Sequence, residues 1–134
     1  EPMEARAVDL LGDDKVDFHP LDLALCAWSF AWLEHAGPES KLLQAISRVA
    51  LRRLNDFSTQ QLANMLWGFD HADYADRDFY VAVARWCCAR PAQWWERAAG
   101  EELVSILTAL RPFAGGVDGW PRLEDILYDR ALRP

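Results

Sequence analysis

The spacing of apolar and polar residues along the chain predicts helices and no strands. Apolar positions recur three and four residues apart, as they do on one face of an α-helix. Strict alternation, which marks strands, does not persist for more than a few residues. The pattern therefore predicts an all-α fold. Three of the predicted helices, each preceded by a loop, span Glu39–Leu54, Asp76–Arg90 and Pro121–Leu132.

One pattern occurs twice along the chain and a third time in a weaker form. Phe18–Phe30 (FHPLDLALCAWSF) aligns without a gap with Phe57–Phe69 (FSTQQLANMLWGF), 39 residues later, and five positions are identical. Leu103–Leu110 (LVSILTAL) repeats the middle of the pattern 41 residues after Leu62. Helical segments with a period in this range are typical of stacked hairpins. We therefore expect a short α-solenoid of about three stacked antiparallel helical hairpins.

Residues 1–134 are expected to form a single helical-repeat domain, which the repeated pattern divides into parts. Each repeat is expected to contain a first helix, a loop and a second helix. The expected parts are a leading helix or incomplete repeat over 1–17, repeat 1 over 18–54, repeat 2 over 55–97 and a degenerate repeat 3 over 98–134. Because the chain opens at Glu1 without a methionine, we expect it to be a piece of a longer precursor.

Capping signals mark the starts of the first helices. Ser58 fits an N-cap, Gln61 completes a capping box, and Phe57 can staple onto Leu62. Pro20 occupies a first-turn position, where its missing N–H costs nothing. These local signals predict where the first helices of repeats 1 and 2 begin.

Aligned positions also predict packing. The position shared by Ser29, Gly68 and Ala109 is small in every copy, and Gly in mid-helix costs about 1 kcal/mol relative to Ala. Gly68 is therefore expected to allow an adjacent helix to approach closely. Trp28 and Trp67 share another position and are expected to lie in the core.

The composition limits the possible functions. A hydrophobic content of 51% with seven tryptophans indicates a globular chain. The net charge is −7, so an attraction for phosphate backbones would require a local basic face. The longest apolar run, Leu23–Leu33, is about half of what a bilayer crossing needs. Three cysteines provide no pairing framework, which favours a reducing compartment.

The Phe57–Phe69 segment resembles the first helix of octotricopeptide repeats, and its Leu-Ala-Asn-x-Leu-Trp core carries the resemblance. This family of helical hairpins is found mainly in algal and protist organelles. The match spans residues 18–69 and, more weakly, 98–132. The resemblance implies an α-solenoid in an organelle, with a plastid favoured over a mitochondrion. It also implies RNA binding, since most characterised members assist organellar RNA processing, stability or translation.

Two sets of residues are candidates for partner contacts. Tryptophans in loops or at helix starts would serve as anchors for a partner protein. These are Trp94, Trp95 and Trp120. For RNA, polar residues on the first helices would read bases and arginines on the second helices would follow the backbone. These are Gln61, Asn64, Arg48, Arg52 and Arg85, with Arg122 as an extension.

The expected face for base reading combines the positions of Asp22, Gln61 and Glu102 with those of Asn64 and its counterparts. Acidic residues on this face would repel phosphates, and no Lys or Arg lies on it. A surface that is solvated or faces a protein is the alternative.

No residue pattern indicates catalysis, a cofactor or a metal. The sequence contains no nucleophile with a base, no Gly-rich phosphate loop and no carboxylate pair at a useful spacing. The acidic segment Asp70–Asp78 lacks the spacing of a calcium or zinc site and is expected to cap helices. Two non-enzymatic functions remain: a scaffold or accessory subunit that binds protein subunits of an organellar assembly, of the photosynthetic or ribosomal type, and an RNA-binding module. The charge favours the scaffold.

Overall fold

The computed structural model describes Arg6, Asp9, Gly12 and residues 19–25, 41–74 and 76–132. Within these residues the regular structure is helical and contains no strand, which confirms the all-α prediction. Arg6 and Asp9 are helical and Gly12 lies in a turn, and the other residues of the expected leading part, 1–17, lie outside the described residues. Trp28, Ser29 and Cys26 also lie outside them.

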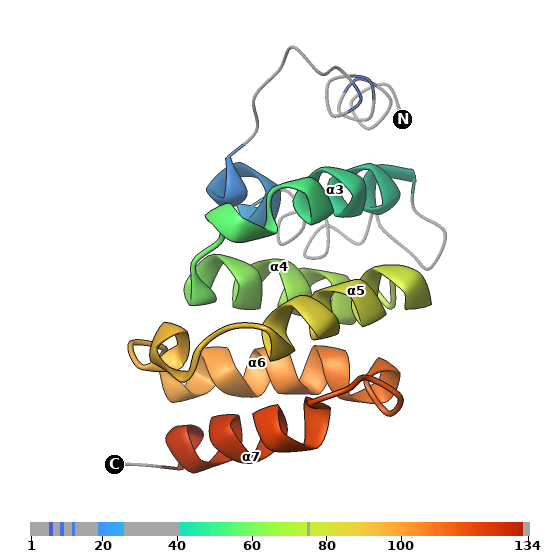
Figure 1. The fold of residues 1–134 in the computed structure, drawn as a ribbon. Coiled ribbons are helices and arrows are strands. Elements are labelled where there is room, and N and C mark those ends of the chain that lie inside the picture. Colours follow the sequence, from blue (N-terminus) through green and yellow to red (C-terminus); the bar gives the residue numbers. More distant parts are fainter. Residues whose placement is uncertain are drawn as a thin grey trace.

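The described helices follow the predicted order (Figure 1). Residues 20–25 are helical, so Pro20 takes its predicted first-turn position. The longer helices are α3 (Lys41–Arg52), α4 (Thr59–His71), α5 (Arg77–Cys88), α6 (Gly100–Leu110) and α7 (Trp120–Ala131). Short 3₁₀ helices follow or connect them: η1 (Leu54–Asp56), η2 (Ala92–Trp95) and η3 (Arg111–Phe113). The observed α3, α5 and α7 match the three predicted loop-preceded helices to within a few residues at each end.

Among the helices from α3 to α7, α3 lies at one end and α7 at the other, with α4, α5 and α6 between them (Figure 1). The first helices α4 and α6 pack along each other, and α6 also packs along α7. The helix α5 contacts α3 on one side and α6 and α7 on the other. Helices that are not adjacent in the sequence therefore contact one another directly.

Equivalent repeat positions are buried in one hydrophobic core. Leu23, Leu62 and Leu103, which occupy the same aligned position, are all buried, and so are Phe69 and Leu110 at a second position. Burying an aliphatic or aromatic side chain of this size contributes about 1.5–3 kcal/mol. The aligned apolar residues therefore join the described helices through one continuous core.

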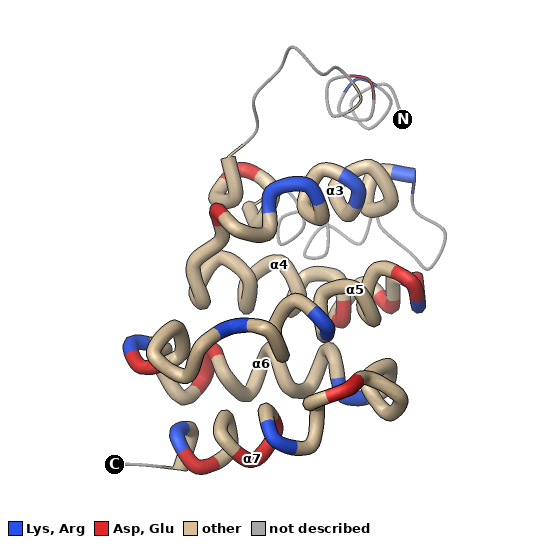
Figure 2. The backbone as a smooth tube through the Cα atoms, viewed as in Figure 1, with Lys and Arg blue, Asp and Glu red and all other residues tan. Residues whose placement is uncertain are grey.

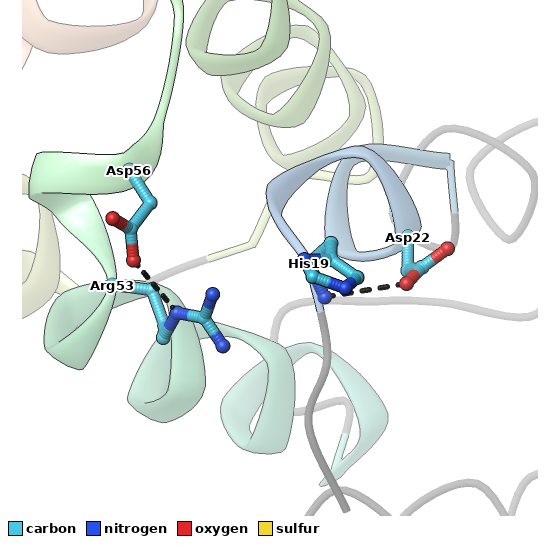
Figure 3. Close-up of polar contacts among 4 residues, drawn as sticks. All are labelled: His19, Asp22, Arg53 and Asp56. Atoms are coloured by element: carbon cyan, nitrogen blue, oxygen red, sulfur yellow. Dashed lines mark hydrogen bonds and ion pairs between the residues drawn. The ribbon is translucent and has the colours of Figure 1, made fainter.

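The helix starts use the predicted caps. The Ser58 hydroxyl accepts a hydrogen bond from the Gln61 N–H, and the Gln61 side chain accepts one from the Ser58 N–H, which completes the capping box. The Asp76 carboxylate accepts from the Phe79 N–H and caps α5. In repeat 1, the Asp22 carboxylate accepts from the His19 N–H at 3.2 Å (Figure 3). The acidic turn before α5 thus provides a cap, as its sequence predicts.

A cluster of aromatic side chains holds the turn between α4 and α5. Phe69, Tyr74, Phe79 and Tyr80 contact one another, and the Tyr80 ring stacks on Phe113 with centroids 4.3 Å apart. The Tyr80 hydroxyl donates to the Tyr74 carbonyl at 2.8 Å. Burial is the largest cause that raises the pKa of Tyr74 to about 12. This turn is therefore fixed by core packing as well as by its cap.

Candidate functional site

The tryptophans predicted as exposed anchors are mostly buried. Trp95 is 0% exposed and Trp120 is 5% exposed, so the prediction that they form a surface contact is wrong for both. Trp95 ends η2, in the connection that precedes α6, and Trp120 begins α7. Both side chains are part of the hydrophobic core. Only Trp94 retains partial exposure.

Trp94 is part of an aromatic group with Trp86 and Trp95. Its ring meets Trp86 and Trp95 edge to face, with centroids 5.2 and 4.7 Å apart. The Arg90 guanidinium lies 4.3 Å above the Trp86 ring, and the Trp86 indole N–H donates to Asn55 Oδ1 at 2.9 Å. The group therefore attaches the connection after α5 to η1, which favours a structural role for Trp94.

The candidate arginines lie on the second helices. Arg48 and Arg52 on α3 and Arg85 on α5 are all exposed. Arg122 lies in the first turn of α7, whereas Arg48 and Arg85 lie about two turns into their helices. The extension of the basic ridge to Arg122 therefore stays a prediction.

Arg48 and Arg85 each line an open groove that also contains carboxylates. Arg48 lines a groove of about 370 Å³ between α3 and α5, beside Asp76 and Asp78. Arg85 lines a groove of about 430 Å³ with Arg77 and Asp78. Figure 2 shows basic and acidic segments interspersed over α5 and α7 and the loops beside them. The mixed charge gives neither groove the uniform positive field that favours a phosphate backbone.

The predicted base-reading face is only partly exposed. Gln61 caps its own helix and Asp22 accepts from the His19 backbone, so these side chains already have structural partners. Gly68 and Ala109, at the small position, are buried, which favours their predicted role in packing and excludes them from a ligand-facing surface. Of the residues proposed to read bases, Asn64 alone remains as an exposed candidate that lines a cavity.

A small groove between α4 and α6 is the candidate site. Its volume is about 250 Å³. From α4 it is lined by Gln60, Ala63, Asn64 and Trp67, and from α6 by Glu101, Glu102 and Ser105. We call this cavity the α4–α6 groove. Trp67 is half-buried and faces this groove, so the prediction that its ring is fully in the core is wrong.

Helix geometry determines which residues face the groove. Gln60, Asn64, Trp67 and His71 follow one another at intervals of four, three and four residues along α4, which places them on one stripe. The Trp67 ring stacks on His71, with centroids 4.8 Å apart and planes 8° apart. The face chosen from the sequence combined the positions of Gln61, Asn64 and Gly68, so it shares Asn64 with this stripe and is rotated from it by about 60°. The 60–64–67–71 spacing was the signal that could have identified this stripe.

The α6 side of the groove is acidic. Glu101 and Glu102 lie in the first turn of α6, where the helix dipole favours carboxylates. Glu102 Oε1 accepts a hydrogen bond from the Thr59 hydroxyl at 3.0 Å, which joins the starts of α4 and α6. The lining combines these carboxylates with polar side chains and an indole, and contains no Lys or Arg.

Other reactive groups in the described residues do not form a site. Burial raises the pKa of the Cys87 thiol, and desolvation also raises the pKa of Cys88, which disfavours the reactive thiolate form of both. No group of three metal-binding side chains is present among the described residues. No helix in the described part of the chain is both long and apolar enough to cross a bilayer.

Comparisons of the chain with protein-family profiles, with curated proteins and with solved structures find no match.

Proposed function

We propose that this chain is a non-enzymatic helical-repeat scaffold or accessory subunit, which binds partner proteins within an organellar assembly. The observation that carries the proposal is the α4–α6 groove, an acidic and aromatic surface that spans two repeats. Acidic lining repels phosphates, and an aromatic ring beside polar groups is typical of contacts with protein side chains.

The proposal includes the finer architecture. The direct packing of α4 on α6, and of α5 on α3 and α7, supports a short α-solenoid of about three antiparallel hairpins. The resemblance of Phe57–Phe69 to octotricopeptide repeats supports membership of that family and an organellar location, with a plastid favoured. We propose a photosynthetic complex or a ribosome as the type of assembly.

A sedimentation experiment tests the scaffold function. The tagged protein should co-sediment with a large complex in an organelle extract, and nuclease treatment should leave its position in the gradient unchanged. A loss of co-sedimentation after nuclease treatment would favour RNA as the partner. Sedimentation as a free chain with and without nuclease would overturn the scaffold function.

RNA binding is the second candidate, and one observation favours it. Arg48 and Arg85 are exposed at similar positions on α3 and α5, and each lines a groove beside its helix. A ridge of a few arginines could contact a few phosphates and would give modest affinity that decreases steeply with salt.

A double charge reversal tests the RNA-binding alternative. With Arg48→Glu and Arg85→Glu, affinity for a single-stranded RNA should fall at least tenfold at low salt, because two phosphate contacts become repulsive. The matched control is Arg6→Glu with Arg97→Glu, which changes the net charge equally at two exposed arginines outside both grooves. Equal RNA binding by wild type and the first pair would exclude this ridge.

A further inference from the structure

The α4–α6 groove has the size of one side chain. Its volume of about 250 Å³ is below the range of roughly 300–1,000 Å³ that small-molecule and cofactor sites occupy. It is open to solvent between two helices, with side chains of both helices in its lining. A groove of this size suits one residue that projects from a larger partner.

The charge of the groove selects a cation. Glu101 and Glu102 contribute two negative charges, whereas the start of α6 contributes roughly half of one positive charge through its dipole. No basic side chain of α4 or α6 lines the groove to neutralise the carboxylates. The local field therefore remains negative, and the occupant that complements it is positively charged.

The other lining groups favour arginine over lysine. Asn64, Gln60 and Ser105 provide side-chain oxygens that accept hydrogen bonds, and the two carboxylates provide four more. A guanidinium carries five N–H donors in one plane and also stacks on aromatic rings such as the indole of Trp67. An ammonium group has three donors and no planar face, so it would use fewer of these contacts.

We propose that the α4–α6 groove binds an arginine side chain of a partner protein, held by Glu101 and Glu102 and stacked against Trp67. This inference rests on the proposed scaffold function and names the chemistry of the partner: a basic protein segment. The carboxylates that attract a guanidinium would repel a nucleic-acid backbone, so the same groove disfavours RNA.

A peptide titration followed by NMR tests the proposal directly. The probe is acetyl-Gly-Arg-Gly-amide, and its matched control carries citrulline, a neutral residue of the same shape, in place of arginine. The arginine peptide should shift the signals of the Trp67 indole N–H and the Asn64 side-chain amide. Its affinity should exceed that of the citrulline peptide by about tenfold, which corresponds to about 1.4 kcal/mol. Equal affinity for both peptides would overturn the proposal.

Two variants locate the effect in the groove. Glu101→Gln with Glu102→Gln should weaken arginine-peptide binding about tenfold and leave citrulline-peptide binding unchanged. Asp118→Asn with Asp125→Asn is the control, because it removes two exposed charges of the same sign on the loop before α7 and on α7. Equal weakening by both pairs would indicate a general charge effect and contradict the groove. Circular dichroism of each variant verifies that the helices are intact.

Two further outcomes separate this inference from the scaffold function. If a single-stranded oligouridylate shifts the groove signals and the arginine peptide does not, the groove proposal fails in favour of nucleic acid. If the Glu101→Gln, Glu102→Gln protein still co-sediments with its nuclease-treated complex as wild type does, the scaffold function stands and the groove is not its contact. If wild type itself fails to co-sediment, the scaffold function fails whatever the peptide result.

Discussion

At the scale of single residues, Tyr74 connects three parts of the molecule. Its hydroxyl donates to Asp76 Oδ2 at 3.1 Å and lies 3.1 Å from Ser47 Oγ on α3. Its carbonyl accepts from the Tyr80 hydroxyl on α5. Because the ring is buried among other aromatic residues, these polar groups have little access to water. If the Tyr74 hydroxyl were removed, water would therefore not replace its hydrogen bonds to Ser47 and Asp76.

Tyr74→Phe should lower the free energy of unfolding by about 1–2 kcal/mol, because it removes the hydroxyl and leaves the buried Ser47 without one partner. Urea denaturation followed by circular dichroism measures the change. Tyr128→Phe is the control, since the Tyr128 ring is exposed on α7 and keeps its contact with Arg111 in the variant. Similar stability losses in the two variants would contradict the role of the Tyr74 hydroxyl.

At the scale of helices, the residues at helix starts have capping roles. Asp22 and Gln61 occupy the same repeat position, and each accepts from the N–H of the residue three positions earlier. Glu102, at the corresponding position of α6, accepts instead from Thr59 of α4. The position chosen for base reading therefore has a structural role in all three copies.

Ser58→Ala should destabilise the protein by about 1 kcal/mol, because α4 loses the side-chain acceptor of its capping box. Ser58→Asp should retain most of the stability, since a carboxylate also caps a helix start. Thermal unfolding of both variants measures the effect. Ser105→Ala is the control, because Ser105 lies within α6 and not at a helix start. If Ser58→Ala and Ser105→Ala had equal melting temperatures, the cap would be energetically unimportant.

Gly68→Leu should cost about 1–3 kcal/mol, because a large side chain must enter a buried position of α4. The matched control is Gly116→Leu, at an exposed glycine with no other atom within 4 Å of the place its Cβ would occupy. Chemical denaturation compares the two variants. An unchanged unfolding free energy for Gly68→Leu would show that the small position leaves spare room.

The sequence predicted helix positions better than it predicted the faces of helices. Helix starts depend on local residues such as Ser58 and Asp76, so their caps are visible in the sequence. Which residues face a groove depends on the rotation of each helix against its neighbours, and this rotation is set by tertiary packing. The expected surface included Asn64 but extended to Gln61 instead of Trp67.

At the scale of the whole molecule, the connections between helices also place side chains in the hydrophobic core. Trp95, in the connection before α6, is fully buried, and the Arg130 side chain of α7 donates to the Glu96 carbonyl in the same connection. The start of α6 also approaches the end of α7, since a Cβ on Gly100 would lie 3.1 Å from the Ala131 carbonyl oxygen. The sequence could not show that this connection folds inward, because its burial depends on contacts with distant residues.

Trp95→Ala should destabilise the protein by about 3–5 kcal/mol, because it leaves a large cavity beneath the connection. Trp94→Ala should cost less, since its ring is only half-buried. Guanidinium denaturation of the two variants provides the comparison. Equal losses would indicate that Trp95 does not have the core role that its burial implies.

The edge-to-face contacts of Trp86, Trp94 and Trp95 have a spectroscopic consequence. Indoles whose centroids lie 5.2 and 4.7 Å apart couple their electronic transitions, and the fixed angles between the rings make this coupling chiral. The native protein should therefore show an intense exciton couplet in its circular dichroism. Since the three chromophores belong to α5 and the segment that follows it, the couplet would report when that segment docks during refolding.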